Sequence, residues 1–206
     1  MSIHQLQSNV GGKLELDRAL AEAAPRRVRT RETRRVTFGV IVGNRGFFPG
    51  HLARTGREEI LRTLEAAGYS AVIVGADETN YGAIESRDEA KLCAELFQRH
   101  RGAIDGIIVT LPNFGDERGI GDTIRLAGLN VPVLVHATAD DPAKMGIDAR
   151  RDAFCGKMSA CNVLSQYGIP YTLTSQHTQR LDSASFRGDL VEFAATCRVV
   201  RGLRNA

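Results

Sequence analysis

From Val36 onward, short apolar runs alternate with segments of helical periodicity, and this alternation is the feature that most constrains the fold. Five runs rich in β-branched and other apolar residues predict strands at 36–42, 71–74, 104–111, 131–137 and 171–175. Runs that are apolar almost throughout are typical of strands covered on both faces. Connections long enough to hold a helix favour right-handed crossovers and therefore a parallel sheet. We predict an α/β fold: a doubly wound, flavodoxin-like (Rossmann-like), three-layer domain with a five-stranded parallel sheet.

The segments that follow the predicted strands carry apolar residues three or four positions apart, as amphipathic helices do. In the segment before the fifth strand, this spacing predicts a core-facing stripe at Phe154, Met158, Cys161 and Tyr167. Glycines stand near the ends of four helical segments, where a left-handed residue is easily accommodated. They are Gly68, Gly102, Gly128 and Gly168. These signals predict five helices.

The chain divides at about residue 35. Residues 1–34 are predicted to form a separate, mobile, basic N-terminal arm, and residues 35–206 the α/β domain, ending at a domain boundary. Six arginines fall between Arg26 and Arg35, so the rest of the chain is close to neutral or slightly acidic, although the formal net charge is +3. Such a run can bind phosphates, but a solvated basic leader is the favoured interpretation.

Composition argues against several classes of partner. Aromatic residues make up only 6% of the chain and Trp is absent, which disfavours a stacking platform for nucleic acid. There is no apolar run of 18 residues to span a membrane, and the first 34 residues lack the apolar core of a signal peptide. The four cysteines form no CxxC pair and are interpreted as free thiols in a reducing compartment. We therefore predict a cytoplasmic protein without nucleic-acid or membrane partners.

Ligands of an open parallel sheet bind at the carboxyl ends of the strands, so the loops there are the candidate site. The loop after the first strand contains two glycines followed by Phe47-Phe48-Pro49, which does not fit a dinucleotide fingerprint. It is also not rich in Ser and Thr, as a flavodoxin phosphate loop is. No Gly-Lys-Ser/Thr phosphate loop is present, and the third strand ends in Thr110-Leu111-Pro112 without the acceptor Asp of a receiver domain. These chemistries are unsupported.

The same loops contain amides, a guanidinium group and aromatic rings. Asn44, Arg45 and Asn113 can hydrogen-bond hydroxyl groups, and Phe48 and Phe114 offer flat apolar faces. Further candidates on this rim are His136, Phe47 and Tyr81. Sugars are bound by such a mixture of polar and aromatic groups. Alternatives stay open, because a loop asparagine is often a turn former and exposed phenylalanines often mark local packing or an oligomer contact.

The sequence offers no convincing catalytic or metal-binding constellation. The five histidines show no HxH or HxxxH spacing, and a metal between His136, His177 and Asp140 or Asp141 is the disfavoured interpretation. There is no nucleophile elbow, and no cysteine lies beside a histidine in an electropositive loop. We predict neither catalytic nor metal-binding residues within this chain.

Several stretches, in collinear order, resemble the N-terminal domain of the L-fucose/L-arabinose isomerase family, and in particular of L-fucose isomerase-like proteins. The stretches are 39–49 (GVIVGNRGFFP), 109–117 (VTLPNFGDE), 126–134 (LAGLNVPVL), 151–158 (RDAFCGKM) and 197–206 (CRVVRGLRNA). The last is similar to the linker that precedes the family's second domain. The resemblance covers residues 36–206, and residues 1–34 have no counterpart in it.

The resemblance implies an aldose–ketose isomerase that uses a divalent metal, usually Mn²⁺, while carboxylates move a proton between C1 and C2. In the family these metal and acid/base residues belong to later domains, so this chain alone is expected to be inactive and to bind no cofactor. The first domain lends its loops to a sugar pocket shared with a neighbouring subunit of a homo-oligomer. Carried onto this chain, the substrate-binding residues are Arg45, Asn44 and Phe48, with Asn113 and Phe114.

Two other hypotheses stay open from the sequence. One is a stand-alone module that binds a small metabolite or regulates, without catalysis. The other is a structural assembly domain in which Phe47 and Phe48 lie buried between subunits.

Overall fold

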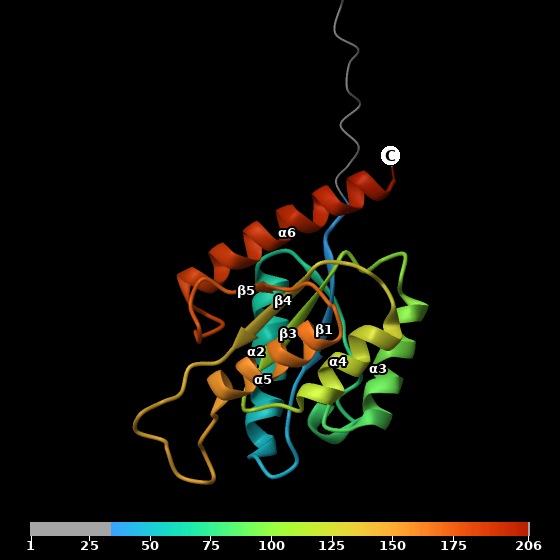
Figure 1. The fold of residues 1–206 in the computed structure, drawn as a ribbon. Helices are drawn as coiled ribbons and strands as arrows, with labels where there is room; N and C mark the ends of the chain where they lie inside the picture. Colours follow the sequence, from blue (N-terminus) through green and yellow to red (C-terminus); the bar gives the residue numbers. More distant parts are fainter. Residues whose placement is uncertain (1–33, 206) are drawn as a thin grey trace, which may run out of the picture. The chain divides into compact units, whose positions relative to one another are not determined.

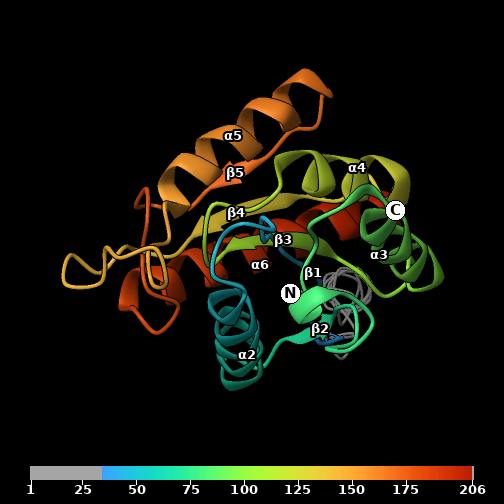
Figure 2. The same ribbon diagram turned by 90° about the horizontal axis from the view of Figure 1, so that it is seen from below.

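The computed structural model describes residues 34–205, and those from Arg35 onward form one compact unit. Its centre is a five-stranded, all-parallel sheet with the strand order β2-β1-β3-β4-β5 (Figure 1; β2 is labelled in Figure 2). The strands are β1 (Thr37–Val42), β2 (Ser70–Val72), β3 (Gly106–Leu111), β4 (Val133–Ala137) and β5 (Thr172–Leu173). This order is that of flavodoxin-like folds, so the predicted fold class is confirmed. The predicted arm, 1–34, lies almost entirely outside the described residues.

Within residues 34–205, five helices cover the sheet in two outer layers (Figure 2). They are α2 (Gly50–Ala66), α3 (Arg87–Arg99), α4 (Glu117–Ala127), α5 (Ala153–Gln166) and α6 (Ala184–Arg204), with a short 3-10 helix, η1 (Asn80–Gly82). Helices α3, α4 and α5 pack on one face of the sheet, and α2 and α6 on the other. Helices on both faces bury the apolar side chains of the central strands completely.

Burial of the strands falls off sharply towards the edges of the sheet. In β1, Phe38 and Val40 face α2 and α6, whereas Ile41 faces the other layer, so alternate side chains enter two separate cores. The edge strand β5 is exposed at both of its residues, and β2 is half-buried throughout. The prediction that all five strands are covered on both faces is therefore wrong for the two edges. An edge strand pairs on one side only and meets fewer packing helices.

The predicted apolar stripe of α5 is wrong for Phe154 and Met158, whereas Cys161 is half-buried and packs against the core as predicted. Phe154 and Met158 are 38% and 53% exposed, and the residues that α5 turns inward are Ala153, Gly156, Lys157, Ala160 and Leu164. The cause is close approach, because a Cβ atom added to Gly156 would overlap the carbonyl group of Phe114. Only small residues fit between α5 and the loop after β3, so the large apolar residues point outward.

None of the described helices is both long enough and apolar enough to cross a membrane.

Candidate functional site

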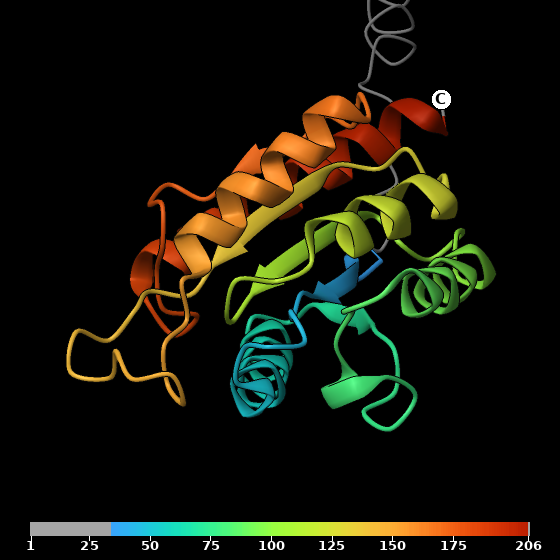
Figure 3. The ribbon, with the colours of Figure 1, turned by 60° about the horizontal axis from the view of Figure 1, so that its bottom comes forward.

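The loops after β1 and β3 leave the sheet side by side, because these two strands are parallel neighbours. Val42 is in register with Thr110, and the Gly43 amide donates to the Thr110 carbonyl over 3.0 Å. The segment after η1 joins them from the other side, since the Asn44 amide donates to the carbonyl of Ile84. Three pieces of chain that are far apart in sequence therefore meet at one end of the sheet. Figure 3 shows the tips of β3 and β4 on the same side as the long segment that follows β4.

Asn44 and Asn113 form the centre of this junction, and both side chains are fully buried. The Asn113 amide nitrogen donates to the side-chain oxygen of Asn44, whose own nitrogen donates to the carboxylate of Glu85. The Asn113 oxygen accepts from the Gly115 backbone amide at 3.2 Å. Each side-chain polar atom of the two amides thus has a protein partner, which fixes the relative positions of the two loops.

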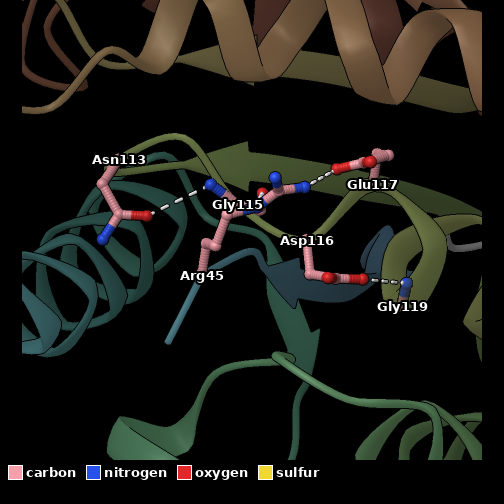
Figure 4. A network of polar contacts seen from close by, with 6 residues as sticks. All are labelled: Arg45, Asn113, Gly115, Asp116, Glu117 and Gly119. Carbon is pink, nitrogen blue, oxygen red and sulfur yellow. Dashed lines mark hydrogen bonds and ion pairs between the residues drawn. The ribbon is translucent and has the colours of Figure 1, made fainter. Parts of the chain in front are cut away.

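Arg45 lies on the outside of this junction and bridges the two loops (Figure 4). Its Nε donates to the Gly115 carbonyl over 3.1 Å, and its guanidinium group forms an ion pair with Glu117. The guanidinium carbon lies 4.5 Å from the ring centre of Phe114, within the range of a cation–π contact. The Arg45 side chain remains 23% exposed, so it is held in place yet still reaches solvent.

Three phenylalanines continue the surface beside Arg45. The ring centres of Phe48 and Phe114 are 5.6 Å apart, and those of Phe47 and Phe48 are 5.1 Å apart. Phe48 and Phe114 are half-buried, whereas Phe47 is 76% exposed. The result is an aromatic face with a guanidinium group at its edge.

The local sequence of the second loop explains its shape. Gly115 has φ of 75°, a left-handed conformation that costs glycine little, and an added Cβ atom would collide with Leu111. Asp116 then caps α4, since its side chain accepts from the Gly119 amide at 2.6 Å. Glu117 stands in the first turn of α4, where the positive end of the helix dipole favours a carboxylate. This geometry presents Glu117 to Arg45.

The structure thus brings together all five residues that the sequence singled out: Arg45, Asn44, Phe48, Asn113 and Phe114. Their proposed contacts with a substrate stay a prediction. No pattern in the sequence pointed to Glu85, which reaches Asn44 only through the return of the chain after β2. Glu117 was recognisable as a loop residue, but not as the partner of Arg45.

His136 does not belong to this rim, although it lies near the end of β4. Its ring is fully buried and packs 4.7 Å from the ring of Phe186. Nε2 donates to the Gln179 carbonyl over 2.9 Å, and Nδ1 therefore accepts from the Thr110 hydroxyl over 3.0 Å. Burial lowers the pKa of His136 to about 4, so the ring is neutral at pH 7. His136 is a core residue, and the suggestion that it binds hydroxyls is wrong.

Lys157 of α5 is another ionisable group buried near the ends of β4 and β5, with only 3% exposed. Its ammonium donates to the Thr174 hydroxyl at 2.7 Å and to the carbonyl oxygens of His177 at 3.0 Å and Gln176 at 3.5 Å. Burial lowers the pKa of Lys157. Its contacts hold the loop after β5 against α5.

A hollow of about 950 Å³ runs along α2 and is bounded on its other side by residues 138–151 and 180–187. Thr138, which follows β4, lines this hollow, is 7% exposed, and its hydroxyl has no hydrogen-bond partner among the described residues. Arg151 also lines it and donates to the Pro112 carbonyl over 2.7 Å, while burial lowers its pKa. The hollow is separate from the aromatic face, whose residues do not line it.

Among residues 34–205, no three or more His, Cys, Asp and Glu side chains gather closely enough to hold a metal ion. The residues described here therefore do not fit a Mn²⁺ site, and the location of the ligands outside this chain stays a prediction.

Comparison with known proteins supports a family assignment. A family model described as "Fucose/sulfoquinovose isomerase, N-terminal domain" matches residues 39–204. Among curated proteins, none matches the chain. The matched range contains every strand except the first two residues of β1, and all of the candidate site.

Proposed function

Because the chain belongs to the family of fucose/sulfoquinovose isomerase N-terminal domains, we propose that it is the first α/β domain of an aldose–ketose isomerase. Its loops after β1 and β3 form one wall of a sugar pocket. Arg45 donates hydrogen bonds to sugar hydroxyls, and Phe48 and Phe114 cover the apolar face of the sugar ring. The wall recognises the substrate and excludes water, and it transfers no proton.

The observation that carries this proposal is the pairing of the partly exposed Arg45 guanidinium with the ring of Phe114, at the carboxyl edge of the sheet. Open α/β sheets bind ligands at this edge. The contact with Phe114 and the bonds to Gly115 and Glu117 hold the guanidinium group in place, and the side chain stays 23% exposed. We propose that Asn44 and Asn113 act with it by holding the two loops in register. A direct contact of either amide with a sugar requires their mutual bond to open.

In this proposal, none of the ligands of the catalytic metal ion comes from residues 34–205. When bound, Mn²⁺ would stabilise the negative charge that develops on the two sugar oxygens at C1 and C2. No group of side chains among residues 34–205 suits it, so we assign none of its ligands here. The chain's own share is to orient the sugar.

A pocket shared with a neighbouring subunit is supported by apolar side chains that point outward around the same edge. They include Phe47 at 76% exposed, Ile147 at 91% and Phe154 at 38%. Large apolar groups left in water beside a binding loop are typical of a surface that another chain covers.

The direct test is to titrate this chain with L-fucose and with L-arabinose and to monitor the backbone amide signals by NMR. We expect shifts confined to residues 44–48 and 113–117, with millimolar affinity, because only one wall is present. Arg45→Ala should weaken binding about tenfold, the equivalent of one charge-assisted hydrogen bond. Arg118→Ala is the matched control, since Arg118 is an exposed arginine in the first turn of α4. Shifts that map elsewhere, or equal binding by both variants, would contradict the proposal.

The charge of the sugar can be tested at the same time. Glu117 already neutralises Arg45, so an acidic sugar must compete with that carboxylate. Glu117→Gln should therefore improve binding of a sugar acid more than binding of L-fucose. If the two respond alike, Arg45 does not contact the charged group.

The alternative, a stand-alone module that binds a small metabolite, is favoured by one observation. The hollow along α2 is lined by the Thr138 hydroxyl, which has no hydrogen-bond partner within residues 34–205. In that case the amide NMR signals that shift on addition of the ligand would be those of Thr138, Arg151 and their neighbours. Thr138→Val would abolish these shifts, whereas Arg45→Ala would not.

A further inference from the structure

The outer face of α6 carries a row of apolar and small residues that nothing in the described chain covers. Val191 and Val199 are each 61% exposed, and Ala195 lies exposed midway between them. The opposite face of the helix carries the buried residues Phe186, Leu190, Phe193, Ala194 and Cys197. Figure 2 shows α6 lying beside the sheet. The solvent-facing side of a surface helix is usually polar, so a second apolar face indicates a surface that another chain or segment covers.

Two glycines on this outer face are unexplained by the fold of the chain itself. Among residues 34–205, a Cβ atom added to Gly188 or to Gly202 would meet no atom within 4 Å apart from the neighbouring backbone of its own helix. Glycine inside a helix costs about 1 kcal/mol relative to alanine. The fold would therefore accept alanine at both positions, whereas close approach by another helix would favour glycine.

The row is symmetric about Ala195. Residues seven positions away on either side are Gly188 and Gly202, and those four positions away are Val191 and Val199. When two identical helices cross antiparallel at one residue, each position meets its mirror-related position on the other copy. Glycine then faces glycine and valine faces valine, which allows the two backbones to pack closely.

Two charged residues beside the row are placed at equal distances before and after Ala195, and their charges are opposite. Glu192 precedes Ala195 by three positions and Arg198 follows it by three, so each would face the other residue of a second copy. Both are exposed, and no ion pair of either is found among the described residues. A parallel arrangement would instead place like charges together. This complementarity identifies the occupant as a second copy of the same face.

We propose that two chains associate through α6, antiparallel, around a two-fold axis that passes near Ala195. This contact deepens the oligomeric part of the proposed function and rests on it, but its test needs no sugar. One helix pair buries less than the roughly 1,200 Å² of a stable standard interface, so we expect a roughly micromolar dissociation constant.

Sedimentation velocity of the 206-residue chain, from a few micromolar to several hundred micromolar, should show a monomer–dimer equilibrium. Gly188→Leu should weaken the dimer at least tenfold without lowering the melting temperature of the monomer, because position 188 is exposed and a Cβ atom added there has no neighbour among the described residues outside its own helix. Glu95→Leu, at an exposed position on α3, is the control for added apolar surface. A dimer that survives Gly188→Leu, or a chain that stays monomeric throughout, overturns the proposal.

Charge reversal gives a test specific to the symmetry. Glu192→Arg and Arg198→Glu should each weaken self-association about tenfold, since each places two like-charged pairs in the dimer. An equal mixture of the two variants should form a heterodimer, and the double variant should recover the homodimer. Failure of both recoveries would mean that these residues do not face each other, and it would overturn the proposed register.

A crosslink locates the axis. In a Cys155→Ser background, which removes the exposed native thiol, Ala195→Cys should form an intermolecular disulfide rapidly on mild oxidation. Val199→Cys should not, because its copies lie about 12 Å apart along an antiparallel pair with 1.5 Å rise per residue. Equal crosslinking overturns the antiparallel register. If the Ala195→Cys variant stays monomeric and its new thiol still resists alkylation, another part of the same chain covers this face of α6. That result would also overturn the proposal.

Discussion

Near the ends of β1 and β3, the guanidinium group of Arg45 is held by the loop and still reaches the surface, whereas the ionisable side chains of His136 and Lys157, near the ends of β4 and β5, are buried. Arg45 bonds to Gly115 and Glu117 yet stays 23% exposed, and Phe47 beside it is largely exposed. His136 and Lys157 are buried, bond mainly to backbone carbonyl and hydroxyl groups, and have lowered pKa values. Arg45 is therefore accessible, as the proposed sugar contact requires, whereas His136 and Lys157 contribute to the fold.

The strongest test of this contrast is the dependence of stability on pH. The pKa of His136 is about 4 in the folded protein and near 6.5 when unfolded, so the unfolded chain binds more protons between these values. The stabilising contribution is complete above pH 6.5 and is lost as pH falls towards 4. It amounts to about 3 kcal/mol. Urea unfolding at a series of pH values should show this loss.

The control for that experiment is His136→Gln, which cannot titrate. Its unfolding free energy should be lower at about pH 8, because the buried contacts with Thr110 and Gln179 are altered. Its dependence on pH between 6.5 and about 4 should be shallower. Equal slopes for the two proteins would show that His136 is not sealed from solvent.

The next largest effect is expected at the amide pair. Asn44→Ala and Asn113→Ala should each lower the unfolding free energy by about 2 kcal/mol, because each leaves buried polar partners unsatisfied. The double variant should lose about 1 kcal/mol less than the sum, since the two residues share one hydrogen bond. Urea unfolding of the four proteins measures this coupling. Strict additivity would mean that the amides do not act as a pair.

Lys157→Met should lower stability by about 1 kcal/mol. It removes three donated hydrogen bonds but also removes the cost of burying a charge, so the two effects partly offset. Hydrogen exchange should accelerate at residues 174–178, which Lys157 holds, and not at residues 43–48. Unchanged exchange after β5 would contradict the role of Lys157 in ordering that loop.

The smallest effect on stability is expected at Arg45. Arg45→Lys should cost less than about 1 kcal/mol, because the side chain is partly exposed and water screens its ion pair. The same variant should lose the stacked, forked geometry that only a guanidinium provides, and so weaken sugar binding. A thermal shift assay beside the sugar titration separates the two effects. A large loss of stability would place Arg45 with the structural residues instead.

Local sequence predicted some parts of the site better than others. The positions of Arg45 and Asn113 at one edge of the sheet were predicted, because apolar runs reveal where a strand ends and the carboxyl ends of parallel strands lie together. The partners Glu85 and Glu117 were not found, since no local pattern shows which carboxylate folds back onto which loop. His136 was misplaced for the same reason: a polar residue at a strand end can point to solvent or into the core.

What the sequence alone determined is the order of strands and helices, because hydrophobic periodicity is a local property of the chain. The inward face of α5 was decided only by the tertiary structure. Spacing pointed to Phe154 and Met158, but contact with the Phe114 carbonyl leaves room for Gly156 alone and turns the large side chains outward. Packing at that distance depends on two segments separated by about 40 residues, and no local pattern records it.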